Sequence, residues 1–295
     1  MREEPRAFYS DGLRLDASLY LPDREPAAGT PTVIACSGFT GLKTIHPARF
    51  SRALTARGYP CFGFDYRGFG KSEGSAQSVL LDEQARDIVS AVMTVTQERS
   101  LAGRPVVLLG WGMGGGLVLQ AAPLVRSYLA GLVAANGFFD AVRVQRAVRG
   151  SSGWEEFSGW YQKERAAAVQ KTEETEIDAF RIYPLDDVSR GYVDSVLRKT
   201  DGYATTVKIG FADSLLSFRP EAHLEGLEDL PLLIAHGTQN ALHSPEEARS
   251  LFARYPGPKE LHWLEGAGHT EWMADDDPIF IALCDRLHAW LQTLG

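Results

Sequence analysis

The sequence lacks a dense run of lysine and arginine. Its 295 residues include 30 Lys and Arg against 38 Asp and Glu, which gives a formal net charge of -8. An acidic balance of this kind disfavours binding to the phosphate backbone of nucleic acids. We therefore expect a small-molecule substrate and no nucleic-acid partner.

Long apolar runs and clustered cysteines are also missing. No stretch approaches the length of about 20 apolar residues that spans a bilayer, and the opening residues MREEPRAFYS lack the apolar segment of a signal peptide. The three cysteines, Cys36, Cys61 and Cys284, fit free thiols better than a disulfide framework or a zinc site. The sequence thus predicts a cytoplasmic protein with no membrane association, no metal site and no cofactor.

What the sequence does contain is an alternation of short apolar runs with segments of helical periodicity. Residues 6–21 predict a hairpin around Asp11-Gly12. The predicted later strands are 31–36, 59–64, 105–109, 129–135, 231–236 and 259–264, and the predicted helices are 50–57, 80–97, 113–125, 245–255 and 278–291. Strands separated by helices imply parallel pairing, and hence an α/β fold with a doubly wound, mostly parallel sheet.

The alternation stops between residues 137 and 228. This interval carries aromatic and charged residues without clear buried strands, and 162–176 has the composition of a polar helix. We expect 1–136 and 229–295 to form the core, with 137–228 inserted as a helical lid. Its aromatic residues either line an apolar substrate pocket or pack a small core of the lid; they are Trp154, Trp160, Tyr161 and Phe180.

The run VVLLGWGMGGG at 106–116 predicts a strand, a sharp turn and a helix start. This layout is that of the nucleophile elbow G-x-S-x-G, whose serine sits on the turn. Here the serine position holds Gly112, which has no side chain to attack a substrate. The glycine either makes room for substrate or water, or relaxes a strained turn.

Four stretches and a histidine together resemble the α/β-hydrolase superfamily, especially cap-bearing members similar to dienelactone hydrolases and S15-type acyl peptidases. They are CSGFTG (36–41), FDYRGFGKSEG (64–74), LGWGMGGG (109–116), HGTQNALHSPEEA (236–248) and GAGH (266–269). The resemblance implies a catalytic triad, whose positions fall on Gly112, Asn240 and His269. Only the histidine is retained, and it would act as a general base.

The resemblance also implies substitutes for what is missing. Asn240 either orients His269 or is only a turn residue, because an amide cannot stabilise imidazolium by charge. Asp140, after the sixth strand, is either a replacement acid or a charge at a helix N-terminus. By family position, the backbone amides of Phe39 and Met113 form an oxyanion hole.

Further candidates border the expected cleft. Ser37 and Trp111 could contact substrate, although Trp111 also suits packing between sheet and helix. Glu271 could contact substrate or remain a solvated loop carboxylate, and His243 could face the pocket mouth or solvent. Cys36 ends a buried strand, which favours an inert core thiol over a relocated nucleophile.

Three functions are compatible with these residues. The first, which we expect, is an enzyme that uses His269 as a general base for non-covalent hydrolysis, C–C or C–O cleavage, elimination or cyclisation of a mid-sized hydrophobic carbonyl compound. The second is a catalytically dead pseudo-hydrolase that binds a small molecule or a partner. The third is a serine hydrolase whose nucleophile has been mutated. The superfamily resemblance also allows a homodimer.

Overall fold

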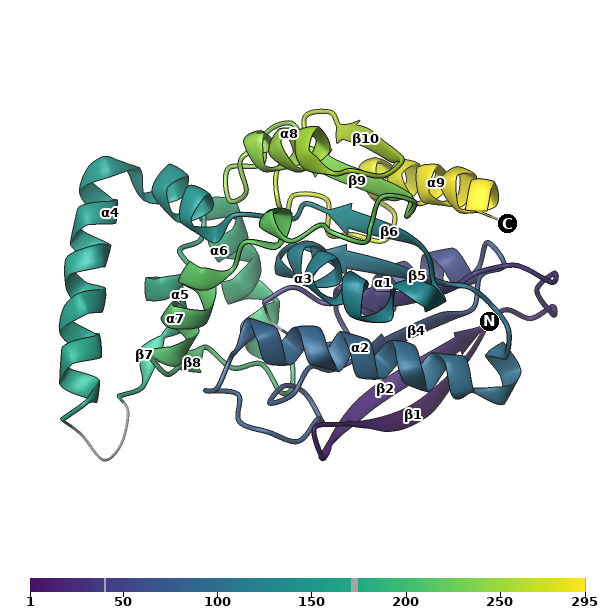
Figure 1. Cartoon of the computed structure of the whole chain (residues 1–295), viewed down its shortest axis with the longest axis horizontal. Coiled ribbons are helices and arrows are strands. Elements are labelled where there is room, and N and C mark those ends of the chain that lie inside the picture. Colours follow the sequence, from purple (N-terminus) through teal and green to yellow (C-terminus); the bar gives the residue numbers. More distant parts are fainter. Residues whose placement is uncertain (40, 171–174, 295) are drawn as a thin grey trace.

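A computed structural model describes residues 1–39, 41–170 and 175–294 of the chain. Eight strands form one sheet in the order β1-β2-β4-β3-β5-β6-β9-β10 (Figure 1). Strand β2 pairs antiparallel with both β1 and β4. All other neighbouring strands, from β4 to β10 in this order, are parallel. The strands are β1 (Arg2–Ser10), β2 (Leu13–Leu21), β3 (Thr32–Cys36), β4 (Cys61–Phe64), β5 (Val106–Trp111), β6 (Leu129–Ala135), β9 (Leu232–Gly237) and β10 (Lys259–Leu264).

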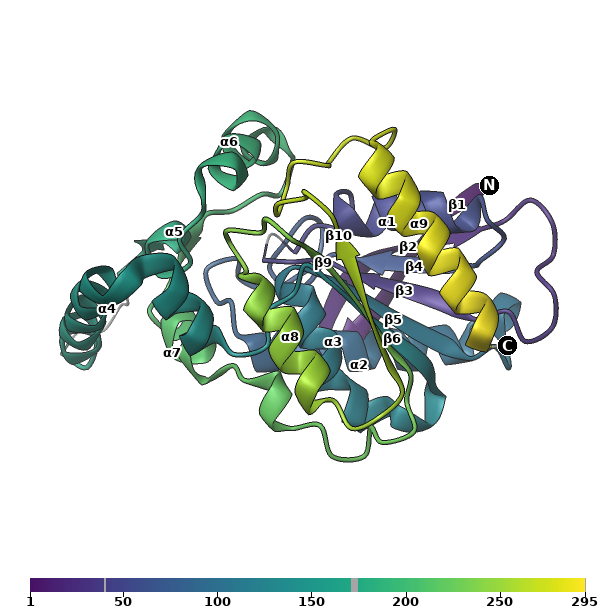
Figure 2. The same cartoon turned by 90° about the horizontal axis from the view of Figure 1, so that it is seen from above.

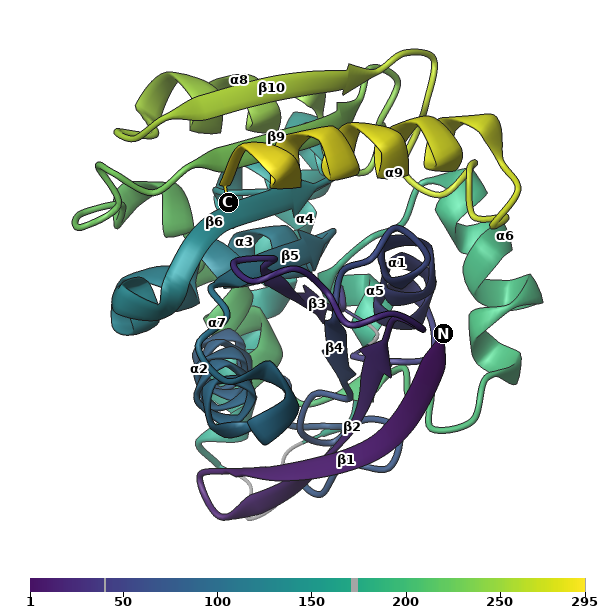
Figure 3. The same cartoon turned by 90° about the vertical axis from the view of Figure 1, so that its right-hand side faces the viewer.

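Helices cover both faces of this sheet. On one face lie α1 (His46–Thr55) and α9 (Pro278–Leu291), and on the other lie α2 (Leu81–Gln97), α3 (Met113–Ala121) and α8 (Pro245–Arg254) (Figure 2). Two separate clusters of buried apolar side chains fill the two interfaces. The doubly wound, mostly parallel sheet predicted from the sequence is therefore confirmed, and Figure 3 shows its twist from the side on which both termini lie.

The segment between β6 and β9 forms a separate group of elements beside the sheet (Figure 1). Its helices are α4 (Ala141–Ala168), α5 (Ala179–Ile182), α6 (Asp187–Ser195) and α7 (Gly210–Ser217), and its strands β7 (Ile177–Asp178) and β8 (Thr206–Val207) pair with each other. We call residues 141–217 the cap. Short 3-10 helices occur at Arg99–Leu101, Ala122–Tyr128, Leu197–Lys199, Pro220–Ala222 and Gln292–Leu294.

Two local expectations are wrong. The polar helix expected over 162–176 is the end of α4, which stops at Ala168, and the chain then turns through 169–170 before residues outside the described part. The helix expected over 113–125 changes to a 3-10 helix at Ala122, next to Pro123. Proline cannot donate a backbone hydrogen bond, which favours such a change. No described helix is both long and apolar enough to cross a membrane.

Candidate active site

Gly112 occupies the turn between β5 and α3. Its backbone has φ 56° and ψ -123°, a conformation that residues other than glycine rarely adopt. Apart from its two chain neighbours, an ideal Cβ on Gly112 would have, among the described residues, only the imidazole of His269 within 4 Å, with Nε2 at 3.6 Å. A Cβ on the flanking Gly110 or Gly114 would instead collide with backbone atoms. The turn therefore has the shape of a nucleophile elbow, and the flanking glycines are sterically required whereas Gly112 faces an open slot.

Two backbone N–H groups border this slot. Met113 is the first residue of α3, so its N–H has no partner within the helix. Phe39 follows β3, and neither N–H has an acceptor among the residues that the structure describes. Met113, Phe39 and Gly112 all line one pocket. The pair expected to form an oxyanion hole thus borders the same cavity as Gly112.

His269 follows β10 and is 7% exposed. Its Nδ1 lies 3.2 Å from Nδ2 of Asn240, which follows β9. Oδ1 of Asn240 accepts the backbone N–H of His243 at 2.8 Å. Burial lowers the pKa of His269 to about 3, and the nearby His46 and His236 contribute to that shift. The two polar members of the expected triad are therefore in contact, and the imidazole is neutral at pH 7.

His46 is a pocket residue that the sequence reasoning missed. It begins α1, and its ring stacks on Trp111 with centroids 4.5 Å apart and an interplanar angle of 23°. Burial lowers its pKa to about 3, and its Nδ1 has no hydrogen-bond partner within the described parts of the chain. The available signal was the pair His46-Pro47, because proline favours the first turn of a helix and this helix follows the loop that carries Phe39.

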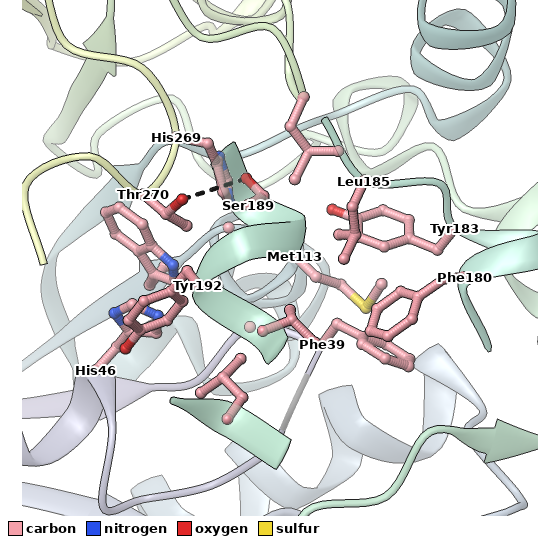
Figure 4. Close-up of a pocket in the computed structure, with 16 residues that line it drawn as sticks. Phe39, His46, Met113, Phe180, Tyr183, Leu185, Ser189, Tyr192, His269 and Thr270 are labelled. Atoms are coloured by element: carbon pink, nitrogen blue, oxygen red, sulfur yellow. Dashed lines mark hydrogen bonds between the residues drawn. The ribbon is translucent and has the colours of Figure 1, made fainter. Parts of the chain in front are cut away.

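The cap supplies the opposite wall of the pocket (Figure 4). Ser189 of α6 meets Thr270 of the core, with their hydroxyl oxygens 3.3 Å apart. Together with the solvent space at its mouth, the cavity measures about 510 Å³. The lining side chains from the cap are Phe180, Tyr183, Leu185, Ser189, Tyr192, Val193 and Leu197. The pocket is therefore largely apolar, with its polar groups collected around His269.

The sequence suggested that His243 faces either the pocket mouth or solvent. Both expectations are wrong, because His243 is fully buried. Its Nδ1 donates a hydrogen bond to the carbonyl oxygen of Asn136 at 2.6 Å, and its Nε2 forms a hydrogen bond with the hydroxyl of Tyr183. Burial keeps its pKa well below the usual value. His243 thus connects the cap wall to the core behind His269.

Three lid residues that we expected to line the pocket lie elsewhere. Trp154, Trp160 and Tyr161 surround Phe157 on α4, with ring centroids 5.6–6.4 Å from it. The hydroxyl of Tyr161 donates to Asp213 at 2.7 Å. These side chains form a small core of the cap, whereas Phe180 does line the pocket. The spacing of aromatic residues along a helix does not show whether they line the pocket or pack in the small core of the cap.

Four other candidates also fall outside the pocket lining. Asp140 caps α4 by accepting the N–H of Arg143 at 3.0 Å, so it is not a replacement acid for His269. Glu271 is exposed and accepts the N–H of Thr270. Ser37 is fully buried, and its Oγ has no partner among the described residues. Burial raises the pKa of the Cys36 thiol, as expected for an inert core cysteine.

The described residues contain no group of three or more His, Cys, Asp or Glu side chains that could hold a metal ion. The described residues that line the pocket offer two imidazoles, but no carboxylate and no thiol. The backbone amides and neutral imidazoles of this lining can form hydrogen bonds to a polarised oxygen of a substrate.

Comparison with known families gives a match that covers most of the chain. The model of the serine aminopeptidase S33 family matches residues 30–276. The chain belongs to this family, which has the α/β-hydrolase fold. This S33-family protein therefore has a hydrolase scaffold, in which Gly112 occupies the turn between β5 and α3.

Individual relatives are more distant. An uncharacterized 31.7 kDa protein from Escherichia coli is 26% identical over 244 residues, which cover 82% of this chain and 84% of that protein. The polyketide transferase ATR5 of Stachybotrys chlorohalonatus is 24% identical, over 94% of this chain and 92% of its own length. The crystal structure of the α/β hydrolase GrgF from Penicillium sp. sh18 matches 99% of both chains with a TM-score of 0.80 at 18% identity. At such an identity the last comparison supports the fold alone.

Proposed function

We propose that this protein is an enzyme that transforms a mid-sized hydrophobic carbonyl compound without forming a covalent intermediate. The reactions concerned are non-covalent hydrolysis, C–C or C–O cleavage, elimination and cyclisation. The observation that carries this proposal is the open slot at Gly112, which faces Nε2 of His269 beside the N–H groups of Met113 and Phe39, neither of which has an acceptor among the described residues. Such a site can stabilise a developing oxyanion although it cannot form an acyl-enzyme.

The loss of covalent catalysis does not abolish rate enhancement. In serine proteases without their triad, the oxyanion hole and substrate binding still give about 10³–10⁴ over water. An activated substrate, such as a lactone or a β-dicarbonyl compound, could supply the remainder. The apolar wall of the pocket and the similarity to a polyketide transferase favour a polyketide-like substrate of secondary metabolism.

We further propose a cellular location for the protein and a role for its lid. We place it in the reducing cytoplasm, because Cys36, Cys61 and Cys284 are free and buried. We also propose that the lid interval 137–228 closes over the substrate, since the cap forms one wall of the pocket.

The test uses the purified protein with para-nitrophenyl butyrate and with a long-chain β-diketone. We expect turnover of at least one compound above the buffer rate, an unchanged intact mass of the protein throughout, and a loss of about 10²-fold or more in His269→Ala. His223→Ala is the matched control, because His223 is exposed and lies outside the pocket lining.

Three outcomes would contradict the proposal. A mass increase equal to the acyl group would reveal a covalent intermediate on another side chain. Full activity of His269→Ala would remove the imidazole from the reaction. Tight binding of the β-diketone with no conversion of either compound would instead support the ligand-binding pseudo-hydrolase.

A further inference from the structure

The side-chain amide of Asn240 has its orientation set by the backbone. Oδ1 of Asn240 accepts the N–H of His243 at 2.8 Å. If the amide were reversed, its NH₂ group would face that N–H, and two donors would meet in a buried site. Asn240 is 2% exposed, so such a mismatch would be costly. Nδ2 is therefore the atom that faces His269, at 3.2 Å from Nδ1.

This orientation decides where the imidazole carries its proton. An amide NH₂ group only donates hydrogen bonds, so Nδ1 of His269 must accept. A neutral imidazole has one N–H, which then has to be on Nε2, the atom that faces the slot at Gly112. A second proton on Nδ1 would face the NH₂ group, in agreement with the pKa of about 3 that burial and the neighbouring His46 and His236 impose.

We infer that Asn240 holds His269 in the Nε2–H tautomer, so that the imidazole offers a hydrogen-bond donor, and no base, to a substrate oxygen beside Gly112. Asn240 is thus a positioning residue for His269. In a triad, the carboxylate accepts the Nδ1 proton and leaves Nε2 free to take one. The general-base role that the sequence suggests for His269 requires that opposite tautomer.

The consequence for the substrate rests on the proposed function. The N–H groups of Met113 and Phe39 and the Nε2–H of His269 border one pocket, and its described lining has no carboxylate. All three groups are donors that suit a carbonyl compound whose negative charge is shared by two oxygens. An enolised β-dicarbonyl compound has this pattern: the amides receive one oxygen and the imidazole receives the other. A neutral imidazole is known to polarise a carbonyl in this way.

The tautomer can be measured in the native protein by long-range ¹H–¹⁵N NMR of histidine-labelled material at pH 7. His269→Gln assigns the signal of His269 among the seven histidines. We expect Nδ1 in the unprotonated range and Nε2 in the protonated range. In Asn240→Asp we expect a proton on Nδ1, because a carboxylate accepts it. An unprotonated Nε2 in the native protein would overturn the inference.

A second experiment uses Gly112→Ser and a fluorophosphonate probe. Labelling forms a bond from the serine Oγ to phosphorus, releases fluoride and requires an unprotonated Nε2 of His269 to accept the hydroxyl proton. The single variant should label slowly, since Nε2 already carries a proton. Gly112→Ser with Asn240→Asp should label at least about 10²-fold faster; in a serine protease, the reverse exchange of aspartate for asparagine costs about 10⁴ in turnover.

The matched control is Gly112→Ser with Gln239→Asp, which adds a carboxylate at the exposed neighbour of Asn240. This control should label as slowly as the single variant, and equal labelling of all three would count against the inference. If the double variant with Asn240→Asp does not fold, the NMR measurement on the native protein still decides. Failure of the proposed function would leave the native tautomer unchanged, whereas an unprotonated Nε2 would leave any observed turnover intact, so the two failures are distinguishable.

Discussion

Nε2 of His269 lies 3.6 Å from the point that a Cβ on Gly112 would occupy. Among the described residues, no other atom outside the two adjoining residues comes within 4 Å of that point except Cε1 of the same ring. A side chain can therefore be added at position 112 without a steric collision, and its effects will report on backbone strain and on the use of the slot.

Gly112→Ala should destabilise the protein by about 1–3 kcal/mol, because a side chain is strained at a φ of 56°. It should also reduce turnover, because the methyl group would occupy space beside Nε2 of His269. Urea unfolding and steady-state rates measure the two effects. Gly159→Ala is the control: it lies within α4 with open space around its Cβ, and should stabilise the helix by up to about 1 kcal/mol. A Gly112→Ala variant as stable as the native protein would contradict the strain.

Stability should fall as the pH is lowered from 7 to 5. His46 and His269 have pKa values of about 3 in the folded state against 6.5 ordinarily, so below pH 6.5 the unfolded chain binds protons that the folded chain does not. Each of these two histidines then lowers the free energy of unfolding by about 2 kcal/mol between pH 6.5 and 5. His236 and His243, whose pKa values are also lowered, act in the same direction.

His46→Phe isolates one of these contributions while retaining a ring that can stack on Trp111. Urea unfolding at pH 7 and at pH 5 should show a pH dependence about 2 kcal/mol smaller in this variant than in the native protein. An equal dependence in both proteins would show that His46 titrates normally in the folded state.

The sequence predicted most of the core fold because the central strands β3, β5 and β6 are nearly continuous apolar runs. The bounds expected for 129–135 and 259–264 coincide with β6 and β10. The motifs also located Gly112, Asn240 and His269, since each lies in the turn or loop that follows a strand at one edge of the sheet. The orientation of the Asn240 amide was not predictable, because it depends on a backbone N–H whose position only the folded loop determines.

The lining of the pocket by the cap was the least predictable part. Trp154 and Tyr192 both lie on cap helices with polar neighbours, and only tertiary packing decides that α6 faces the core while this part of α4 packs around Phe157. His46 was missed for a similar reason, because the pair His46-Pro47 indicates a helix start but not that the imidazole faces the pocket.

Ser37→Ala should leave the KM for para-nitrophenyl butyrate unchanged and should not weaken the fold. The Oγ of Ser37 is buried without a partner among the described residues, and a buried hydroxyl without a hydrogen bond costs about 1–3 kcal/mol. Its removal should therefore raise the free energy of unfolding by about 1 kcal/mol. Ser244→Ala, which removes the cap of α8, should instead lower it by about 1 kcal/mol. A tenfold higher KM in Ser37→Ala would show that Ser37 contacts the substrate.

Tyr192→Ala and Trp154→Ala compare the two aromatic surfaces of the cap. Tyr192 lines the pocket, so its truncation removes apolar contact with a bound substrate and should raise KM about tenfold. Trp154 packs on Phe157 beneath Arg146 and away from the pocket lining, so its loss should change KM less than twofold while lowering the thermal midpoint. Circular dichroism verifies that both variants fold. If Trp154→Ala raised KM while Tyr192→Ala did not, substrate would have to enter along α4, and the apolar wall formed by α5 and α6 would not be the surface that recognises it.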